Sequence, residues 1–182
     1  EDPLELPDMP KAVARIRQAV ASRHSILVFG DSDVDGITSS AIVSELLTSL
    51  GAKPIVRISN RLANGYGFPG VLVQEAVRLK VGLVILLDCG TNQAEEILTL
   101  ATSRIETIVL DHHVPTDRLA HPHALVNPHQ GAGAGEGLCS AGLAFKLAQA
   151  MWGTADERLV SLLDLAAIGT LADYAPLLGE NR

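Results

Sequence analysis

Short, continuous runs of mostly apolar residues recur along the chain, and an aspartate follows three of them within two residues. They are Ser25–Phe29, Val81–Leu87 and Glu106–Leu110. A strand that is buried on both faces needs apolar side chains without interruption, whereas a strand with one wet face alternates. Segments with helical spacing stand between these runs. The chain therefore predicts an α/β fold, a parallel-sheet sandwich with helices on both faces of the sheet.

The other segments continue this alternation. Ala12, Val13, Ile16 and Val20 share one face of a predicted helix over Met9–Ala21. We expect further strands at Lys53–Ile58 and Ala124–Val126, and further helices at Ile37–Leu50, Val71–Leu79, Gln93–Ala101, Cys139–Trp152 and Glu157–Ile168.

Composition limits the class of protein. The 182 residues suffice for one domain with a real core, and 47% hydrophobic but only 3% aromatic residues make that core aliphatic. The net charge of −7 argues against a free-standing nucleic-acid binder and suits a site rich in carboxylates that cations neutralise. With two cysteines, no signal peptide and no apolar run that could span a bilayer, we expect a cytoplasmic protein with no membrane partner. Both chain ends resemble cuts from a longer protein.

Acidic and histidine residues follow the predicted strands at the points where they end. The segment Gly30–Gly36 reads GDSDVDG, Asp88 follows the second run, and Asp111–His113 follows the third. In parallel sheets these carboxyl ends meet at one edge, where ligands bind. A fourth cluster, Gly169–Asp173, follows a predicted helix and has to fold back to reach that edge. Carboxylates and imidazoles gathered in this way predict a two-metal phosphoesterase site.

The first cluster carries three carboxylates at a spacing of two. In an extended segment Asp31, Asp33 and Asp35 point the same way, and they repel one another unless cations lie between them. A turn followed by a helix N-cap is the plainer interpretation, but it accounts for one Asp rather than three. The hydroxyls of Thr38, Ser39 and Ser40 fit either a phosphate contact at the helix N-terminus or ordinary caps.

The remaining clusters allow different roles. Asp88, at the end of a central strand, can bridge two cations through its two oxygens, although a lone Asp there is usually a turn former. Since adjacent side chains diverge in an extended segment, one of His112 and His113 is expected to be a ligand and the other a phosphate contact or proton donor. Asp111 can orient a histidine, and a solvated turn is the plainer interpretation.

Other polar features carry less weight. A zinc site from Cys89, Cys139 and His112 matches no common zinc signature. The glycine-rich stretch Gln130–Gly137 fits a flexible loop better than a nucleotide-binding motif. The remaining histidines are expected at the surface or in loops; they are His24, His121, His123 and His129.

Together these motifs resemble the DHH phosphoesterase superfamily, and within it the RecJ-type single-strand-specific exonucleases. Asp111–His113 is the motif that names the superfamily, and Gly30–Gly36 is similar to the RecJ form of the first motif. Secondary motifs make the resemblance specific, and it covers nearly the whole chain; they are Asn60-Arg61, Gly65–Gly67, Asn127-Pro128, Ala141–Phe145, and Gly169–Asp173 through Glu180–Arg182.

The resemblance implies a 5′-to-3′ exonuclease on single-stranded DNA, acting in DNA repair and recombination. It implies two Mn²⁺ or Mg²⁺ ions and catalytic support from Asp31, Asp111 and His113. Phosphate contacts are expected from Arg61, whose plainer role is a surface salt bridge, and from Ser39. We expect a monomer, with a helicase or a single-strand-binding protein as candidate partners. The implied metal ligands are Asp33, Asp35, Asp88, His112 and Asp173, with Asp88 bridging.

Two departures from the family pattern affect this expectation. Phe29 stands where many members carry a histidine, which leaves one metal site short of a ligand. We expect residues 1–182 to form a single DHH catalytic domain that lacks the DHHA1 and OB-like domains of full-length relatives. Two other functions stay open: a phosphodiesterase for short oligonucleotides or cyclic dinucleotides, and an inactive fragment or scaffold.

Overall fold

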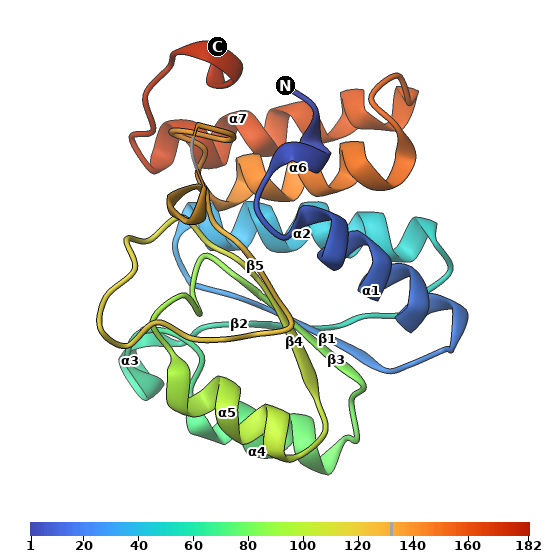
Figure 1. Cartoon of the computed structure of the whole chain (residues 1–182), viewed down its shortest axis with the longest axis vertical. Helices are drawn as coiled ribbons and strands as arrows, with labels where there is room; N and C mark the ends of the chain where they lie inside the picture. The colour runs from blue at the N-terminus through green and yellow to red at the C-terminus, as the bar shows by residue number, and fades with distance from the viewer. Residues whose placement is uncertain (132) are drawn as a thin grey trace.

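Five parallel strands form one sheet in the order β2-β1-β3-β4-β5. The computed structural model describes residues 1–131 and 133–182, so Ala132 of the predicted glycine-rich loop lies outside the described residues. This order places the three strands that are followed by aspartates side by side in the middle of the sheet (Figure 1). The strands are β1 (Ile26–Gly30), β2 (Ile55–Ile58), β3 (Leu83–Leu87), β4 (Glu106–Leu110) and β5 (Ala124–Val126).

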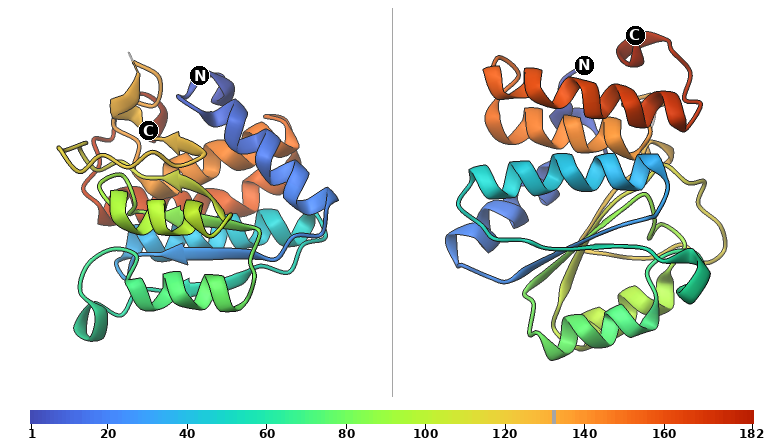
Figure 2. Two further views of the ribbon diagram at one scale, coloured as in Figure 1. Left: turned by 60° about the horizontal axis from the view of Figure 1, so that its bottom comes forward. Right: turned by 180° about the vertical axis from the view of Figure 1, so that it is seen from behind.

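Helices cover both faces of the sheet, as the sequence predicts. Figure 2 shows α4 and α5 on one face, and α1, α2 and α6 on the other, with α7 stacked outside α2 and α6. The helices are α1 (Met9–Ala21), α2 (Val34–Ser49), the short α3 (Arg61–Asn64), α4 (Gly70–Arg78), α5 (Ala94–Thr102), α6 (Ser140–Trp152) and α7 (Leu163–Ala172). Short 3₁₀ turns occupy Pro3–Glu5, Pro128–Gln130, Glu157–Leu162 and Gly179–Asn181.

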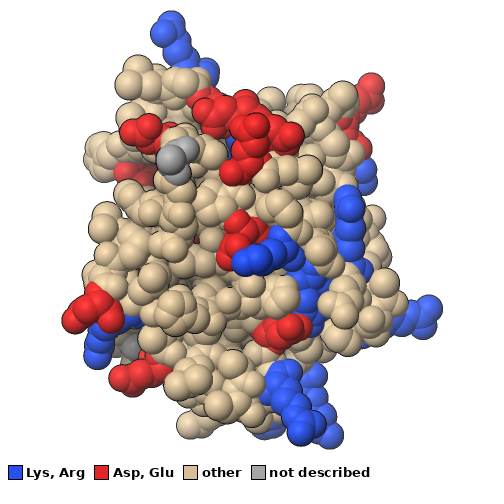
Figure 3. All heavy atoms as spheres, viewed as in Figure 1, with Lys and Arg blue, Asp and Glu red and all other residues tan. Residues whose placement is uncertain are grey.

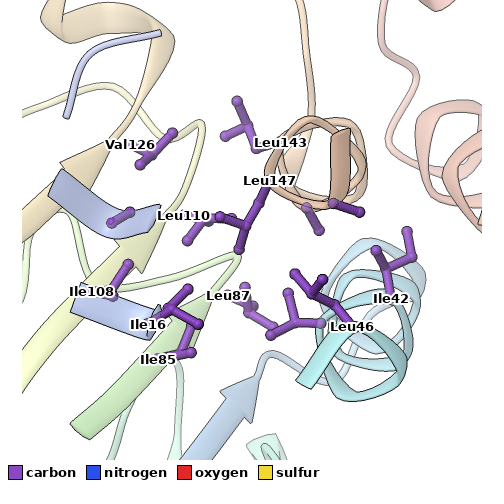
Figure 4. Close-up of a cluster of buried hydrophobic side chains, with 14 of the residues drawn as sticks. Ile16, Ile42, Leu46, Ile85, Leu87, Ile108, Leu110, Val126, Leu143 and Leu147 are labelled. Carbon is purple, nitrogen blue, oxygen red and sulfur yellow. The ribbon is translucent and has the colours of Figure 1, made fainter. Parts of the chain in front are cut away.

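The alternation of side chains along each strand divides the interior into two cores. Residues such as Ile85 and Leu87 face α1, α2 and α6 and build the larger core, part of which Figure 4 shows. Their neighbours Val84 and Leu86 face α4 and α5. Because β1 and β3 are buried on both faces along their whole length, all their side chains are apolar. Phe29 belongs to the second core, where its ring meets that of Phe68 edge-on at 5.0 Å between centroids.

The predicted strands are confirmed, and two of the predicted helices have different bounds in the structure. The segment Glu157–Ile168 is not one helix, because a 3₁₀ turn precedes α7, which then runs on to Ala172. The helix after β1 begins at Val34, because Asp33 caps it by accepting the Gly36 N–H at 3.0 Å. Asp35 is therefore helical, and the extended arrangement expected for the three aspartates is wrong. Among the described residues, no helix combines the length and apolarity needed to cross a membrane.

Candidate metal centre

The carboxyl edge of the sheet holds three aspartates in fixed positions. Asp31, Asp88 and Asp111 each follow a central strand directly. Their backbone N–H groups continue the sheet, donating to the carbonyl oxygens of the next strand at 3.2, 3.0 and 3.1 Å respectively. All three side chains are buried. The sheet itself thus brings together carboxylates that lie far apart in the sequence.

The three aspartates of the first cluster have three different sets of partners. Asp31 accepts two hydrogen bonds from Arg61, at 2.7 and 3.1 Å, and Arg61 also reaches Asp33 at 2.9 Å. Asp35 accepts the backbone N–H groups of Ser140 and Ala141, both at 2.7 Å. These two amides are at the start of α6, whose N-terminus attracts negative charge. Asp35 thereby joins α2 to α6 at the edge of the candidate centre.

Two glycines permit the close approach of backbones around these carboxylates. A Cβ on Gly36 would lie 2.4 Å from the Asp31 carbonyl oxygen. A Cβ on Gly169 would lie 2.5 Å from the Ala141 Cβ and 3.1 Å from an Asp35 oxygen. Since real Cβ atoms do not approach other atoms so closely, α7 can pack here only with glycine at this position.

Asp88 occupies the centre of the cluster in an unusual backbone conformation. Its φ is +61°, a left-handed value that costs energy for residues other than glycine and is better tolerated by Asp and Asn. The Ser140 hydroxyl donates to its carboxylate at 3.3 Å. Burial, together with the nearby charges of Asp35 and Asp33, raises the pKa of Asp88 to about 7. The carboxylates here are crowded and short of positive charge.

His112 faces three carboxylates from three different elements. Its Nε2 atom lies 3.3 Å from Asp88, 3.8 Å from Asp35 and 3.7 Å from Asp173. Burial alone would lower the pKa of this imidazole, but the hydrogen bond to Asp88 and the charge of Asp173 raise it to about 9. Asp173 follows the last residue of α7, so the fourth cluster does fold back to the sheet edge.

His113 points to a different set of partners. Its Nδ1 lies 2.7 Å from the Asp111 carboxylate, and its Nε2 lies 2.7 Å from the Tyr66 hydroxyl. The buried Asp111 also accepts the Thr91 N–H at 3.0 Å. Although burial would raise the pKa of Asp111, its bonds with His113 and Thr91 hold that pKa at about 2. The buried Asn127 donates to the His113 carbonyl at 2.9 Å and fixes the backbone of the motif.

The donor atoms fall into three sets that could each hold a metal ion. Within each set the ligand atoms lie within 4.8 Å of one another, and Asp88 and His112 each belong to two sets. Five carboxylates thus face one guanidinium, that of Arg61, and two imidazoles. In the absence of metal, protons on Asp88 and His112 offset part of the negative charge of these carboxylates. Bound metal cations would offset the same charge. The sets are Asp88/His112/His113, Asp35/His112/Asp173 and Asp31/Asp33/Asp88.

Some predicted roles do not fit the structure. Ser39 is fully buried and its hydroxyl donates to the Gly36 carbonyl at 3.1 Å, so the predicted phosphate contact is wrong: α2 begins earlier and turns this side chain inward. Arg61 lies at the site, but its guanidinium pairs with Asp31 and Asp33. Cys89 and Cys139 belong to different cores on opposite faces of the sheet, which excludes the zinc site.

Several residues of the site carry no signal of their own in the sequence. Ser140 and Thr91 contact the aspartates only because α6 and the segment after β3 reach the sheet edge. Tyr66 lies in a motif of the family resemblance, but its contact with His113 joins residues 47 positions apart. Its ring also lies 5.0 Å from the Arg61 guanidinium carbon. Only the fold reveals these contacts.

The sequence profile described as "DHH family, N-terminal domain" matches residues 25–170. The single-stranded-DNA-specific exonuclease RecJ of Bacillus subtilis (strain 168) is 36% identical over 183 residues, covering 100% of this chain and 23% of that protein. RecJ of Escherichia coli (strain K12) is 34% identical, covering 98% of this chain and 33% of that protein.

Solved structures show the same similarity. A crystal structure of exonuclease RecJ bound to manganese superposes with a TM-score of 0.91 at 34% identity, covering 100% of this chain and 47% of that one. RecJ of Thermus thermophilus in complex with Mn²⁺ gives 0.83 at 33% identity, covering 98% and 26%. The chain thus spans a quarter to a third of the curated relatives cited above. With a family match over most of its length, the chain belongs to the DHH family, of which it carries the N-terminal domain.

Proposed function

We propose that this chain is the metal-dependent catalytic domain of an exonuclease that hydrolyses phosphodiester bonds of single-stranded DNA. The observation that carries the proposal is the convergence of Asp35, Asp88, His112 and Asp173, with Asp33 beside them, at one sheet edge. RecJ relatives that act on single-stranded DNA, and RecJ structures that contain Mn²⁺ or Mg²⁺, support both the substrate and the cofactor.

The donor sets suggest two ion positions that share Asp88. Asp35, His112 and Asp173 form one donor set and would hold one ion, while Asp33 belongs with Asp31 and Asp88 to the set that would hold the other. Asp88, which lies 3.3 Å from His112, is the proposed ligand of both ions. Bound Mn²⁺ or Mg²⁺ would lower the pKa of a water molecule and offset charge on the phosphate oxygens. Phe29 is enclosed in the core against Phe68, so it supplies no ligand to either position.

The remaining residues position the reactive groups and transfer protons. Asp111 holds the His113 ring, and its hydrogen bond raises the pKa of that imidazole. A protonated His113 can donate from Nε2 to a phosphate oxygen or to the leaving oxygen when the substrate takes the place of the Tyr66 hydroxyl. Tyr66 fixes the other nitrogen of the ring at 2.7 Å. Arg61 neutralises Asp31 and Asp33, and its half-exposed side chain is also available to a phosphate.

The protein has a cavity beside the proposed ion positions that can take the end of the substrate strand. A cavity of about 590 Å³ opens next to His112 and Asp173, between the segment after β5 and the segment after α7. His129, Glu136 and Tyr174 are among its lining residues. This volume is sufficient for a terminal nucleotide. The 5′-to-3′ direction rests on the family resemblance, and the monomeric state and protein partners stay predictions.

Single-stranded DNA carrying a 5′ label tests the proposal directly. The chain is incubated with this DNA and Mn²⁺, alongside the variant Asp88→Asn, which keeps the left-handed backbone but removes the charge. Calorimetry measures Mn²⁺ binding in parallel. We expect mononucleotide release and tight Mn²⁺ binding by the wild-type chain only.

The outcomes separate the rival functions. Release from a 3′-labelled strand first would contradict the polarity. Cleavage of cyclic dinucleotides but not of longer DNA would favour the small-substrate phosphodiesterase. Mn²⁺ binding without any hydrolysis would show that this chain alone is not a nuclease, and a lack of Mn²⁺ binding would reject the metal centre itself.

A further inference from the structure

A second cavity lies at the opposite, amino-terminal edge of the sheet. It has a volume of about 890 Å³, and its walls come from α1, α5, the start of β4 and the segments that precede β1, β3, β4 and β5. None of its lining residues belongs to the candidate metal centre. The cavity is therefore a separate feature of the fold.

Cations gather around this cavity although the chain as a whole is acidic. Arg15, Arg23, Lys80 and Arg104 line it together with one carboxylate, that of Glu106. The lining has a formal charge of +3 with neutral histidines, in a chain of net charge −7. On the face shown in Figure 3, Lys and Arg lie mainly over the right-hand and lower parts, the side where the strands begin in Figure 1.

Three of these cations occupy equivalent positions after three helices. Arg23, Lys80 and Arg104 each stand two residues after the last residue of α1, α4 and α5, with φ of +55°, +52° and +61°. The usual residue at this left-handed position is glycine. A cation there also interacts favourably with the helix C-terminus. That interaction explains why each cation is stable, but it leaves the fourth cation, Arg15, unexplained.

Arg15 is buried, and part of its guanidinium lacks a partner. The side chain is only 3% exposed; its Nε pairs with Glu106, and its Nη2 donates to the Gly82 carbonyl at 2.7 Å. The buried Nη1 has no hydrogen-bond partner within residues 1–131 and 133–182. Leaving a buried charged donor without a partner is costly. Because Nη1 is itself buried, an anion in the cavity would supply the missing acceptor after a small rotation of the guanidinium toward it.

The cavity also has an apolar wall. Ile97, Ala101, Ile105 and Pro122 line it beside the cations, and His24, His121 and His123 add aromatic rings. A ligand with a phosphate at one end and an organic group at the other matches both kinds of surface. The volume lies in the range of sites for small organic ligands.

We propose that this cavity binds a small phosphomonoester of the size of a mononucleotide. The phosphate lies against Arg15, Lys80 and Arg104 and accepts the free Arg15 N–H. The organic group lies against the wall formed by Ile97, Ala101 and Ile105. Because the cavity and the metal centre share no residues, the proposal stands or falls independently of the nuclease function.

Calorimetry on the EDTA-treated chain tests the proposal, because without divalent ions the metal centre does not attract phosphate. Deoxyadenosine monophosphate is the probe, with inorganic phosphate as competitor and deoxyadenosine as the phosphate-free analogue. The variant combines Arg23→Asn, Lys80→Asn and Arg104→Asn, since Asn tolerates the left-handed backbone. A control removes the same charge at exposed sites outside the cavity, by Arg17→Gln, Lys53→Gln and Arg182→Gln.

We expect saturable binding of the monophosphate, competition by inorganic phosphate and no binding of deoxyadenosine. The cavity variant should lose affinity about tenfold or more, while the control variant and Asp88→Asn bind as the wild type does. Equal binding by the cavity and control variants, or no binding by the wild type, overturns the proposal. If the triple variant unfolds at a lower temperature, its three single variants are titrated separately, and Lys80→Asn and Arg104→Asn should each weaken binding.

Discussion

The two edges of the sheet carry opposite charges. At the carboxyl edge, Asp31, Asp88 and Asp111 follow β1, β3 and β4, and at the amino edge Arg23, Lys80 and Arg104 precede β1, β3 and β4. In a parallel α/β fold the helices begin at the first edge and end at the second, so acids and cations complement the helix dipoles at both. A dipole of about half an elementary charge does not account for five crowded carboxylates, nor for a buried, partly unpaired Arg15. The excess at each edge is what indicates a binding site.

Neutralising the central carboxylate of the acidic edge should affect metal binding and hydrolysis more than any other single substitution. We expect Asp88→Asn to weaken Mn²⁺ binding and reduce phosphodiester hydrolysis at least about a hundredfold, because this carboxylate belongs to two of the three donor sets. Binding of a monophosphate at the amino edge should not change. A variant that retains full Mn²⁺ affinity would show that Asp88 is not a bridging ligand.

A methyl group at Gly169 should disturb the acidic edge through packing alone. The new Cβ in Gly169→Ala would meet Ala141 and Thr38 at 2.5 and 2.6 Å, so α7 must shift and move Asp173. We expect a loss of about 1–3 kcal/mol in the free energy of unfolding and about tenfold weaker Mn²⁺ binding.

Gly70→Ala is the matched control for this variant, since a Cβ there meets no atom within 4 Å. It should change the free energy of unfolding by less than about 0.5 kcal/mol. Equal effects of the two substitutions in urea unfolding would contradict the role given to the close packing of α7.

Without metal, the acidic edge should make the stability depend on pH. Folding raises the pKa of Asp88 from 3.8 to about 7, and that of His112 from 6.5 to about 9. The folded chain therefore binds more protons than the unfolded chain between pH 4 and 9, and stability falls as pH rises through this window. In EDTA we expect the unfolding midpoint to fall by about 5 °C or more between pH 6 and 9.

Saturating Mn²⁺ should remove most of this fall, because the ions replace the protons. Asp88→Asn in EDTA should also show a smaller fall than the wild type. A midpoint that rises with pH in EDTA would refute the description of the edge as short of positive charge.

The smallest expected effect concerns the orientation of His113. Tyr66→Phe removes the hydroxyl that lies 2.7 Å from His113 Nε2 and keeps the ring beside Arg61. One hydrogen bond of about 0.5–1.5 kcal/mol predicts a threefold to tenfold lower kcat. Mn²⁺ affinity and the unfolding midpoint should stay the same, because the side chain is largely exposed. An unchanged kcat would remove Tyr66 from the catalytic arrangement.

Features that depend on neighbouring residues could be predicted from the sequence. The buried strands β1 and β3 are apolar over their whole length and β4 over its last three residues, so they stand out, and the aspartates that follow them indicate the functional edge. The start of α2 did not follow from the sequence, because Asp33 fits both a helix cap and a metal ligand. The start of α7 did not follow either, because the 3₁₀ turn before it has nearly helical spacing.

The sequence by itself determines the fold class, the acidic edge and the family. The tertiary structure alone decides the contacts: Asp35 at the start of α6, Arg61 on Asp31, and Tyr66 on His113. It also turns Ser39 inward and leaves one nitrogen of Arg15 unpaired at the far edge. The difference comes from how far apart the contacting residues lie in the sequence. Strand and helix patterns arise from residues a few positions apart, whereas these contacts join residues up to 106 positions apart that meet only when the layers pack.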